Sequence, residues 1–174
     1  MGPIRGMNGY PAYHFRMTTN SPGSTAFPRP ATPAPVRRRI DVRGTRLAAT
    51  LTTVVLLAVL LTGSGWLLAA QSVVFAIGAA AGLRFSPYGQ LYARLIRPRL
   101  APPTVFEDEA PPRFAQAVGL VFAVVGTIGY ATGVTAVGLA ATALALAAAF
   151  LNAAFGFCLG CEMYLMLARA KSRA

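Results

Sequence analysis

The sequence predicts an all-α integral membrane protein with four transmembrane helices arranged as two hairpins. Hydrophobic residues make up 55% of the 174 residues and charged residues only 12%, and the mean hydropathy is +0.55. Long apolar stretches without charge are typical of membrane spans rather than of a buried core. The basic residues lie outside these stretches, which is the arrangement that membrane topology favours.

Residues 1–39 are rich in Pro, Gly, Ser and Thr and show no apolar periodicity. A segment of this composition buries too little apolar surface to offset its conformational entropy, so we predict a disordered cytoplasmic tail. It has no early apolar core and no cleavage site of a signal peptide. The stretch "MTTNSPGS" from Met17 predicts an alternative true start of the chain.

The membrane domain is predicted over residues 40–169, with spans at about 47–63, 66–83, 114–133 and 135–157. Each run is apolar and long enough to cross a bilayer. The first two runs, and again the last two, are separated by very short links, which predicts two helical hairpins. Trp66 suits the aromatic belt at a membrane interface.

The connector at residues 84–113 has a different character. Its segment 88–97 carries Leu91, Leu95 and Ile96 on one face and arginines elsewhere, a pattern typical of a short helix lying along the membrane surface. Pro98 is expected to end this helix. A rigid polar stretch, "APPTVFEDEAPPR", then leads to the third span.

The positions of the basic residues predict the orientation. Fifteen of the sixteen are arginine, and they occur before the first span, in the connector, and in a C-terminal segment (170–174) with Lys171 and Arg173. The short hairpin links carry none. By the positive-inside rule, both termini and the connector face the cytoplasm of a bacterial cell membrane. The net charge of +11 therefore reflects topology, and no basic and aromatic surface for nucleic acid is evident.

Two amides, Gln71 and Asn152, interrupt the apolar runs and are expected to face the bundle interior, as structural hydrogen-bonding groups or, for Asn152, as a polar lining. No Asp, Glu, Lys, Arg or His lies within a predicted span. A proton-relay or charged-ion transporter therefore lacks its usual side chains. Small residues recur at four-residue spacing, as in the pairs Gly78/Gly82 and Gly129/Gly133, which favours a compact bundle.

Both cysteines of the chain, Cys158 and Cys161, lie three residues apart at the end of the last apolar run. This spacing is compatible with a disulfide, so the pair could act in thiol redox or sulfur-carrier chemistry. If Gly160 breaks the helix, Cys161 would begin a new helix whose N-terminus favours a thiolate. Glu162 would oppose thiolate formation but is a candidate proton acceptor. On the cytoplasmic side the pair is expected to be mainly reduced.

Two other interpretations of the cysteines stay open. They could be small apolar residues that only pack. They could also bind a soft metal such as copper(I), or, in a homo-oligomer, combine into a four-sulfur site, because the chain offers no convincing third ligand.

The segments "IDVRGTRLAA", "SPYGQLYARLIRPRL", "PPRFAQAVGL" and "FLNAAFGFCLGCEMYL" together resemble the family of bacterial membrane proteins called domain of unknown function 4395, frequent in actinobacteria. The resemblance covers about residues 40–169, and its most specific part matches at Asn152, Gly156, Cys158, Gly160 and Cys161. It implies no activity. Through the usual genomic neighbours of the family, it implies an association with thioredoxin-like and sulfurtransferase proteins.

These observations lead to a first hypothesis, a membrane component of a thiol–disulfide or sulfur-transfer system that acts through Cys158 and Cys161. Its partner would be a thioredoxin-like or sulfurtransferase protein, docking on the 88–97 segment. A structural or anchoring subunit and a carrier of a small solute or soft metal are the alternatives. No cofactor is assigned, and the sequence does not decide whether the chain is an enzyme.

Overall fold

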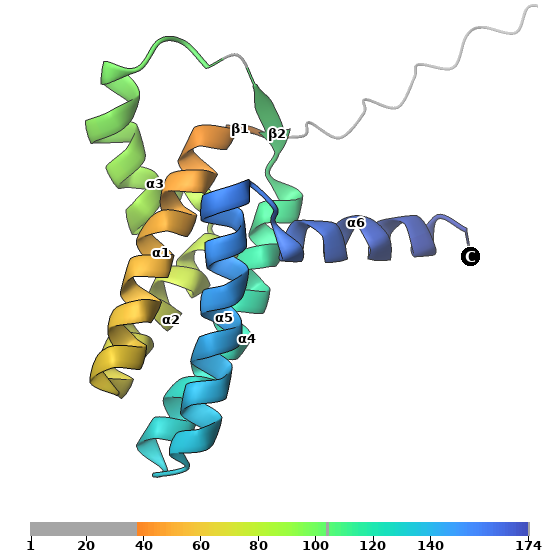
Figure 1. The fold of residues 1–174 in the computed structure, drawn as a ribbon. Coiled ribbons are helices and arrows are strands. Elements are labelled where there is room, and N and C mark those ends of the chain that lie inside the picture. Colours follow the sequence, from red (N-terminus) through yellow and green to blue (C-terminus); the bar gives the residue numbers. More distant parts are fainter. Residues whose placement is uncertain (1–37, 104, 174) are drawn as a thin grey trace, which may run out of the picture. The chain divides into compact units, whose positions relative to one another are not determined.

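The structure is a computed structural model that describes residues 38–103 and 105–173. Residues 1–37 of the predicted tail lie outside the described residues. Four apolar helices form a bundle (Figure 1), namely α1 (Val42–Thr62), α2 (Gly65–Ala80), α4 (Ala110–Ala131) and α5 (Thr135–Phe155). A further helix, α6 (Leu159–Lys171), follows α5 and runs across its direction.

Caps and glycines set the ends of the first two helices. Asp41 begins α1 by accepting a hydrogen bond from the Arg43 N–H at 2.9 Å. Gly63 ends it in the left-handed conformation, at φ 65°. Ser64 then begins α2, its hydroxyl accepting from the Leu67 N–H at 3.3 Å. The link between the two helices is therefore as short as the sequence predicts.

The core lies where α2 packs along α4 and where α5 packs against both α1 and α4. Its buried side chains come from all four helices, and the cluster consists of Leu56, Val59, Leu68, Phe75, Ala123 and Ala145. A Cβ on Gly129 would lie 2.6 Å from the backbone N of Gly138, so α4 and α5 touch through their backbones. Gly133, predicted in the same row, instead forms the turn after α4, at φ 79°.

Three helices in the described residues, α1, α4 and α5, are long and apolar enough to cross a membrane. At 1.5 Å per residue, the 16 residues of α2 extend only about 24 Å, less than the roughly 30 Å of a hydrocarbon core. The predicted second span (66–83) ends earlier because Gly82, at φ 104°, turns the chain into a 3₁₀ turn, η1 (Leu83–Phe85).

The connector contains more structure than the sequence predicts. It forms α3 (Pro87–Leu91), the π-helical turn η2 (Tyr92–Ile96) and the 3₁₀ turn η3 (Arg97–Arg99). Pro98 does not end the helix as expected, because it occupies the first turn of η3, where its missing N–H is tolerated. Leu91 and Leu95 of the predicted apolar face are exposed, whereas Tyr92 is buried.

A two-stranded antiparallel ladder was also not predicted. Strand β1 (Arg39–Asp41) lies in the region assigned partly to the tail, and β2 (Phe106–Asp108) lies in the stretch expected to be a rigid polar connector. Ile40 pairs with Glu107 at the centre of the ladder. The ladder ties the start of α1 to the segment that leads into α4.

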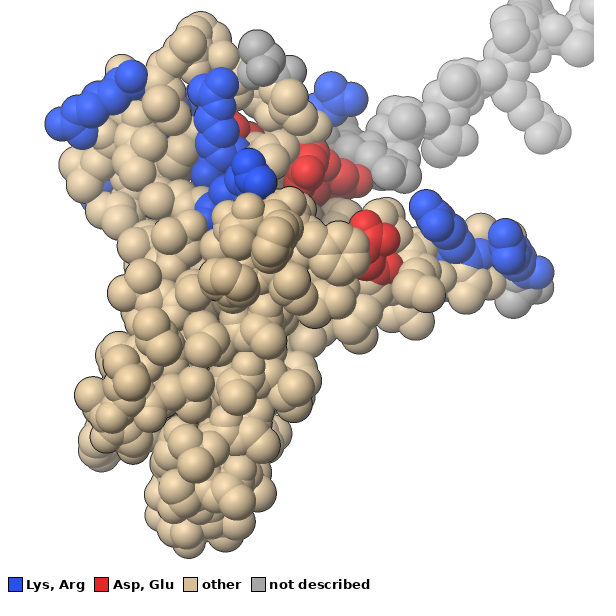
Figure 2. Space-filling model, viewed as in Figure 1, with Lys and Arg blue, Asp and Glu red and all other residues tan. Residues whose placement is uncertain are grey.

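Charged side chains gather at one end of the bundle. In the face shown in Figure 2, the blue and red atoms lie near the strands, the connector and α6, and the opposite end is uniformly tan. The α1–α2 and α4–α5 links lie at that uncharged end (Figure 1), and neither contains a charged residue. The cysteine pair lies near the charged end, at the junction of α5 and α6.

Candidate functional site

The candidate site begins where α5 ends. Gly156 adopts the left-handed conformation at φ 71° and ψ 14°, and its N–H donates to the Asn152 carbonyl at 3.0 Å. This is the glycine C-cap expected at the end of a helix. Whether Gly160 breaks the helix was open from the sequence; in the structure the break falls at Gly156, and Gly160 lies in the first turn of α6.

Cys158 is the N-cap residue of α6. Its backbone is extended, at φ −91° and ψ 99°, and its Sγ accepts a hydrogen bond from the Cys161 N–H at 3.4 Å. The sulfur thus takes the place that a Ser or Asp oxygen usually fills at a helix N-terminus. Cys158, rather than Cys161, consequently holds the position at which a helix stabilises a thiolate.

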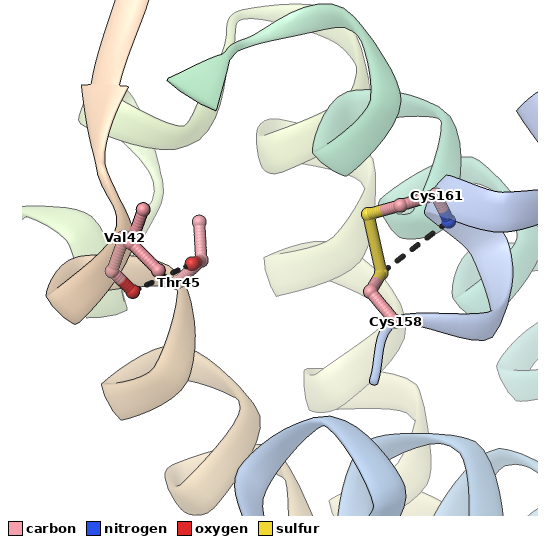
Figure 3. The surroundings of a disulfide bond; sticks show 4 residues. All are labelled: Val42, Thr45, Cys158 and Cys161. Carbon is pink, nitrogen blue, oxygen red and sulfur yellow. Dashed lines mark hydrogen bonds between the residues drawn. A yellow bond between two sulfur atoms is a disulfide. The ribbon is translucent and has the colours of Figure 1, made fainter. Parts of the chain in front are cut away.

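Cys158 and Cys161 are joined by a disulfide in the structure (Figure 3). Their Cα atoms are 5.2 Å apart, within the range that a disulfide needs. The turn at the start of α6 brings the two sulfurs together without any further movement of the backbone. That the pair is mainly reduced in the cytoplasm stays a prediction.

Two contacts hold the start of α6 on the start of α4. A Cβ on Gly160 would lie 2.6 Å from both Cα and Cβ of Ala115, so only glycine allows this approach. One turn further along, the rings of Tyr164 and Phe114 lie 5.8 Å apart at a tilt of 52°. The supporting role predicted for Gly160 is thus a close helix–helix contact, of the kind that rows of small residues favour.

The disulfide lines a cavity of about 630 Å³ between the starts of α1, α4 and α6 and the end of α5. Val42 and Thr45, in the first turn of α1, lie across this space from the two sulfurs (Figure 3). The volume is that of a small-molecule site, and most of the lining is apolar. The cavity brings together all the predicted site residues: Asn152, Gly156, Cys158, Gly160, Cys161 and Glu162.

Arg46 is a functional candidate that the sequence reasoning did not single out. A Cβ on Gly156 would lie 2.8 Å from Arg46 Nη2, so the guanidinium sits against the end of α5. A cation is favourable there because the helix dipole leaves partial negative charge on the last carbonyls. Arg46 also lines the cavity, together with the carboxylates of Glu107, Asp108 and Glu162. Its position 110 residues before Gly156 leaves no sequence signal for the contact.

The start of α4, which carries Phe114 and Ala115, is itself anchored. Arg113 donates to the carbonyls of Ala79 and Ala80 at the end of α2, at 2.9 and 2.6 Å from Nη2. The buried carboxylate of Glu109 accepts from the Leu83 N–H at 3.2 Å. Hydrogen bonds therefore join the end of α2, the connector and the start of α4, and α6 packs on this start of α4.

The other predicted polar residue, Gln71, lies elsewhere. It is 1% exposed, and its Oε1 accepts a hydrogen bond from the Tyr88 hydroxyl at 2.7 Å. This confirms that Gln71 faces the interior and has a partner there. Gln71 does not line the cavity. Burial of its partner Tyr88 raises the pKa of the Tyr88 hydroxyl.

The start of α1, which forms one wall of the cavity, is fixed to the connector by Tyr92. Its ring packs on Gly44, where a Cβ would lie 3.0 Å from the ring, and its hydroxyl donates to the Asp41 carboxylate. Three effects raise the pKa of Tyr92 to about 12: burial is the largest, followed by the hydrogen bond to Asp41 and by the negative charge of Asp41.

Among the described residues, no group of three or more His, Cys, Asp or Glu could hold a metal ion.

The fold and the site define a class of protein. It is a bundle of apolar helices, three of them able to cross a membrane, with a two-cysteine motif at the start of α6, the helix that runs across the direction of α5. A family model described as "Domain of unknown function (DUF4395)" matches residues 40–169, and the chain belongs to this family. Comparison with curated proteins and with solved structures gives no match.

Proposed function

We propose that this chain is a multi-pass protein of the bacterial cell membrane and a component of a thiol–disulfide or sulfur-transfer system that acts through Cys158 and Cys161. The observation that carries the proposal is the cysteine pair itself. It forms a disulfide at the N-terminus of α6 and opens onto a cavity of about 630 Å³.

In the proposed topology, α1, α2, α4 and α5 span the membrane as two hairpins, and both termini and the connector are cytoplasmic. Two observations support it. The basic side chains lie at one end of the described bundle, and the helix links at the other end have none. The short helix α2 spans if the bilayer thins locally beside it, at a modest energetic cost.

The proposed chemistry is thiol–disulfide exchange with a cytoplasmic dithiol of the thioredoxin-like or sulfurtransferase class. A partner thiolate attacks Cys158 Sγ, forms a mixed disulfide and releases the Cys161 thiolate, which takes up a proton. The partner's second thiolate then attacks the partner sulfur of this bond and releases the Cys158 thiolate. Two electrons pass from the partner, which ends as a disulfide, to this chain, which ends as a dithiol.

Cys158 is the sulfur proposed to be shared with the partner, because its thiolate is stabilised by the Cys161 N–H and the start of α6. Glu162, in the same first turn, is the proposed acceptor of the proton that moves during exchange. Arg46 lies in the same cavity and adds positive charge near the site.

Trapping in cells tests the proposal. The variant Cys161→Ser should hold a partner on Cys158 as a mixed disulfide that reductant releases, and Cys158→Ser, the matched control, should hold much less. If neither variant captures a thioredoxin-like or sulfurtransferase protein, and replacement of both cysteines by Ala leaves growth under thiol stress unchanged, the chain is a structural or anchoring subunit.

A small-solute carrier is the second candidate, favoured by the cavity that Asn152 and the cysteines line together. In this case Asn152→Leu would abolish the uptake of small solutes into vesicles in whose membrane the chain has been reconstituted. Trapping of a partner by Cys161→Ser would be unaffected by that change, so the two functions give different results.

A further inference from the structure

The helix α6 presents an exposed apolar stripe. Leu159, Met163, Met166 and Leu167 are 39%, 47%, 66% and 58% exposed, and α6 contains no buried residue. At 100° per residue these positions fall on one face of the helix. Gly160 and Tyr164, which contact α4, lie about 70° and 110° from the middle of the stripe, beside its Leu167 edge. Leu159 and Met163 also line the cavity, whereas Met166 and Leu167 do not, so the exposed part of the stripe is centred on these last two residues.

The charges on α6 flank this stripe. Arg169 and Lys171 lie in the last turn of the helix. They are roughly 90–110° from the middle of the stripe, one on each side. Arg173 follows the helix. Glu162 borders the stripe in the first turn, so the basic border belongs to the C-terminal half of the helix. An apolar face with basic residues on both borders is typical of a helix that lies in the headgroup region of an anionic bilayer.

The place of α6 in the fold agrees with this pattern. The helix leaves the charged end of the bundle and runs across the direction of α5 (Figure 1). In Figure 2 its charged atoms lie on the side away from the tan end of the bundle, and its opposite side is tan. A bilayer surrounding the apolar helices would therefore have its surface along the tan side of α6.

We propose that α6 is an interfacial helix that lies on the cytoplasmic surface of the bilayer, with its apolar stripe in the acyl-chain boundary and Arg169 and Lys171 at anionic lipid headgroups. The cysteine pair at the start of α6 is then held at a fixed depth, at the membrane surface. This inference rests on the membrane insertion proposed above and does not depend on the redox role of the cysteines.

Quenching of a single tryptophan by lipid tests the inference in the full chain. The chain contains one Trp, so Trp66→Phe provides a silent background. Three variants then each carry a single tryptophan reporter. Met166→Trp lies on the stripe, and Ala168→Trp lies two residues further along α6 at a position that is also exposed. Val54→Trp lies on an exposed position of α1. Each is placed in nanodiscs that hold one copy of the chain and a mixture of phosphatidylglycerol and brominated phosphatidylcholine.

We expect the brominated lipid to quench the Met166→Trp reporter at least about threefold more than the Ala168→Trp reporter, and aqueous iodide to give the reverse order. The variant with both Arg169→Gln and Lys171→Gln should show less lipid quenching at Met166→Trp. Equal quenching at the two α6 positions, with Val54→Trp fully quenched by lipid, would overturn the interfacial helix and leave membrane insertion intact. Absence of lipid quenching at Val54→Trp would instead overturn the insertion itself.

A second copy of the chain is the other occupant that could cover the stripe. Discs with one copy exclude it, so lipid quenching in them supports the bilayer as the occupant. If the Met166→Trp reporter is shielded from iodide only in discs with two copies, the face is an interface between copies and the proposal fails.

Discussion

The guanidinium of Arg46, in the second turn of α1, lies directly against Gly156, the residue that ends α5. A Cβ at position 156 would be 2.8 Å from Nη2 and 3.3 Å from Cζ of this arginine. The stronger constraint that selects glycine here is the left-handed backbone at φ 71°. The second is the Arg46 guanidinium, the end of a flexible side chain that a Cβ would displace. The same residue turns the chain so that Cys158 begins a new helix.

The first prediction concerns these two constraints. Gly156→Ala should lower the free energy of unfolding by about 1–2 kcal/mol from the left-handed backbone, and by a smaller further amount because Arg46 is displaced from the end of α5. Gly63→Ala is the matched control, since Gly63 has φ 65° and nothing within 4 Å of a Cβ. Unfolding by sodium dodecyl sulfate in mixed micelles measures both. Equal losses for the two variants would show that Arg46 does not constrain position 156.

The second prediction concerns the attachment of α6. Gly160→Ala places a methyl group 2.6 Å from Ala115 Cα and Cβ, so α6 has to move away from α4. Backbone amides of residues 159–171 should then exchange hydrogen faster, because the helix loses its packing. Leu165→Ala, at a position 37% exposed, serves as the control and should leave the exchange unchanged. Unchanged protection in Gly160→Ala would mean that the contact does not hold the helix.

The sequence predicted which residues form the candidate site, but not how they are arranged in space. Apolar runs predicted four spans, of which three are helices long and apolar enough to cross a membrane and the other is the shorter α2. The cysteine spacing indicated a disulfide-competent pair. Whether Gly160 breaks the helix was left open. The structure ends α5 at Gly156, which lies against Arg46, and packs Gly160 on Ala115 of α4. Such contacts leave no local pattern in a single sequence.

In the connector, too, contacts between distant segments were not predictable from the local sequence. Segment 88–97 was expected to lie along the membrane surface through its leucines, which are exposed, and this stays a prediction. The pattern did not indicate that Tyr92 is buried and packs on Gly44 of α1. The β1–β2 ladder joins residues about 70 positions apart, between segments whose composition indicated a tail and a linker. Apolar periodicity reports which face of a helix is buried, and it does not report pairing between short polar segments.

The third prediction is a pH dependence that arises from Tyr92. Its pKa is raised to about 12, so its neutral form is the one that the folded chain stabilises. This stability is fully present below the unfolded pKa of about 10 and is lost as the pH rises from there through about 12. The free energy of unfolding should thus fall by about 1–3 kcal/mol across this window.

The variant Tyr92→Phe isolates this effect. It should be less stable than the wild type by about 1 kcal/mol at neutral pH, through loss of the bond to Asp41. The stability difference should shrink between pH 10 and 12. Thermal unfolding followed by circular dichroism provides the measurement, with Tyr164→Phe as the control. A difference that stays constant up to pH 12 would contradict the assigned role of the Tyr92 proton.

The last prediction separates the two sulfurs and the role of Glu162. In Cys161→Ser the remaining thiol of Cys158 caps α6, so it should react with iodoacetamide at pH 7 several-fold faster than the thiol of Cys161 in Cys158→Ser. Glu162 lies in the same first turn, and its negative charge opposes thiolate formation. Glu162→Gln should therefore speed alkylation of Cys158 further.

Exchange with a dithiol partner should respond to Glu162→Gln in the opposite way if this carboxylate accepts the proton. The second-order rate of reduction of the Cys158–Cys161 disulfide should fall. The loss should be greatest at about pH 6, where thiolates are scarce but a carboxylate is still ionised and can accept a proton. Glu107→Gln, a change of charge at another carboxylate of the same cavity, is the control. If both variants alter exchange equally, Glu162 acts only through its charge, and proton transfer proceeds through solvent.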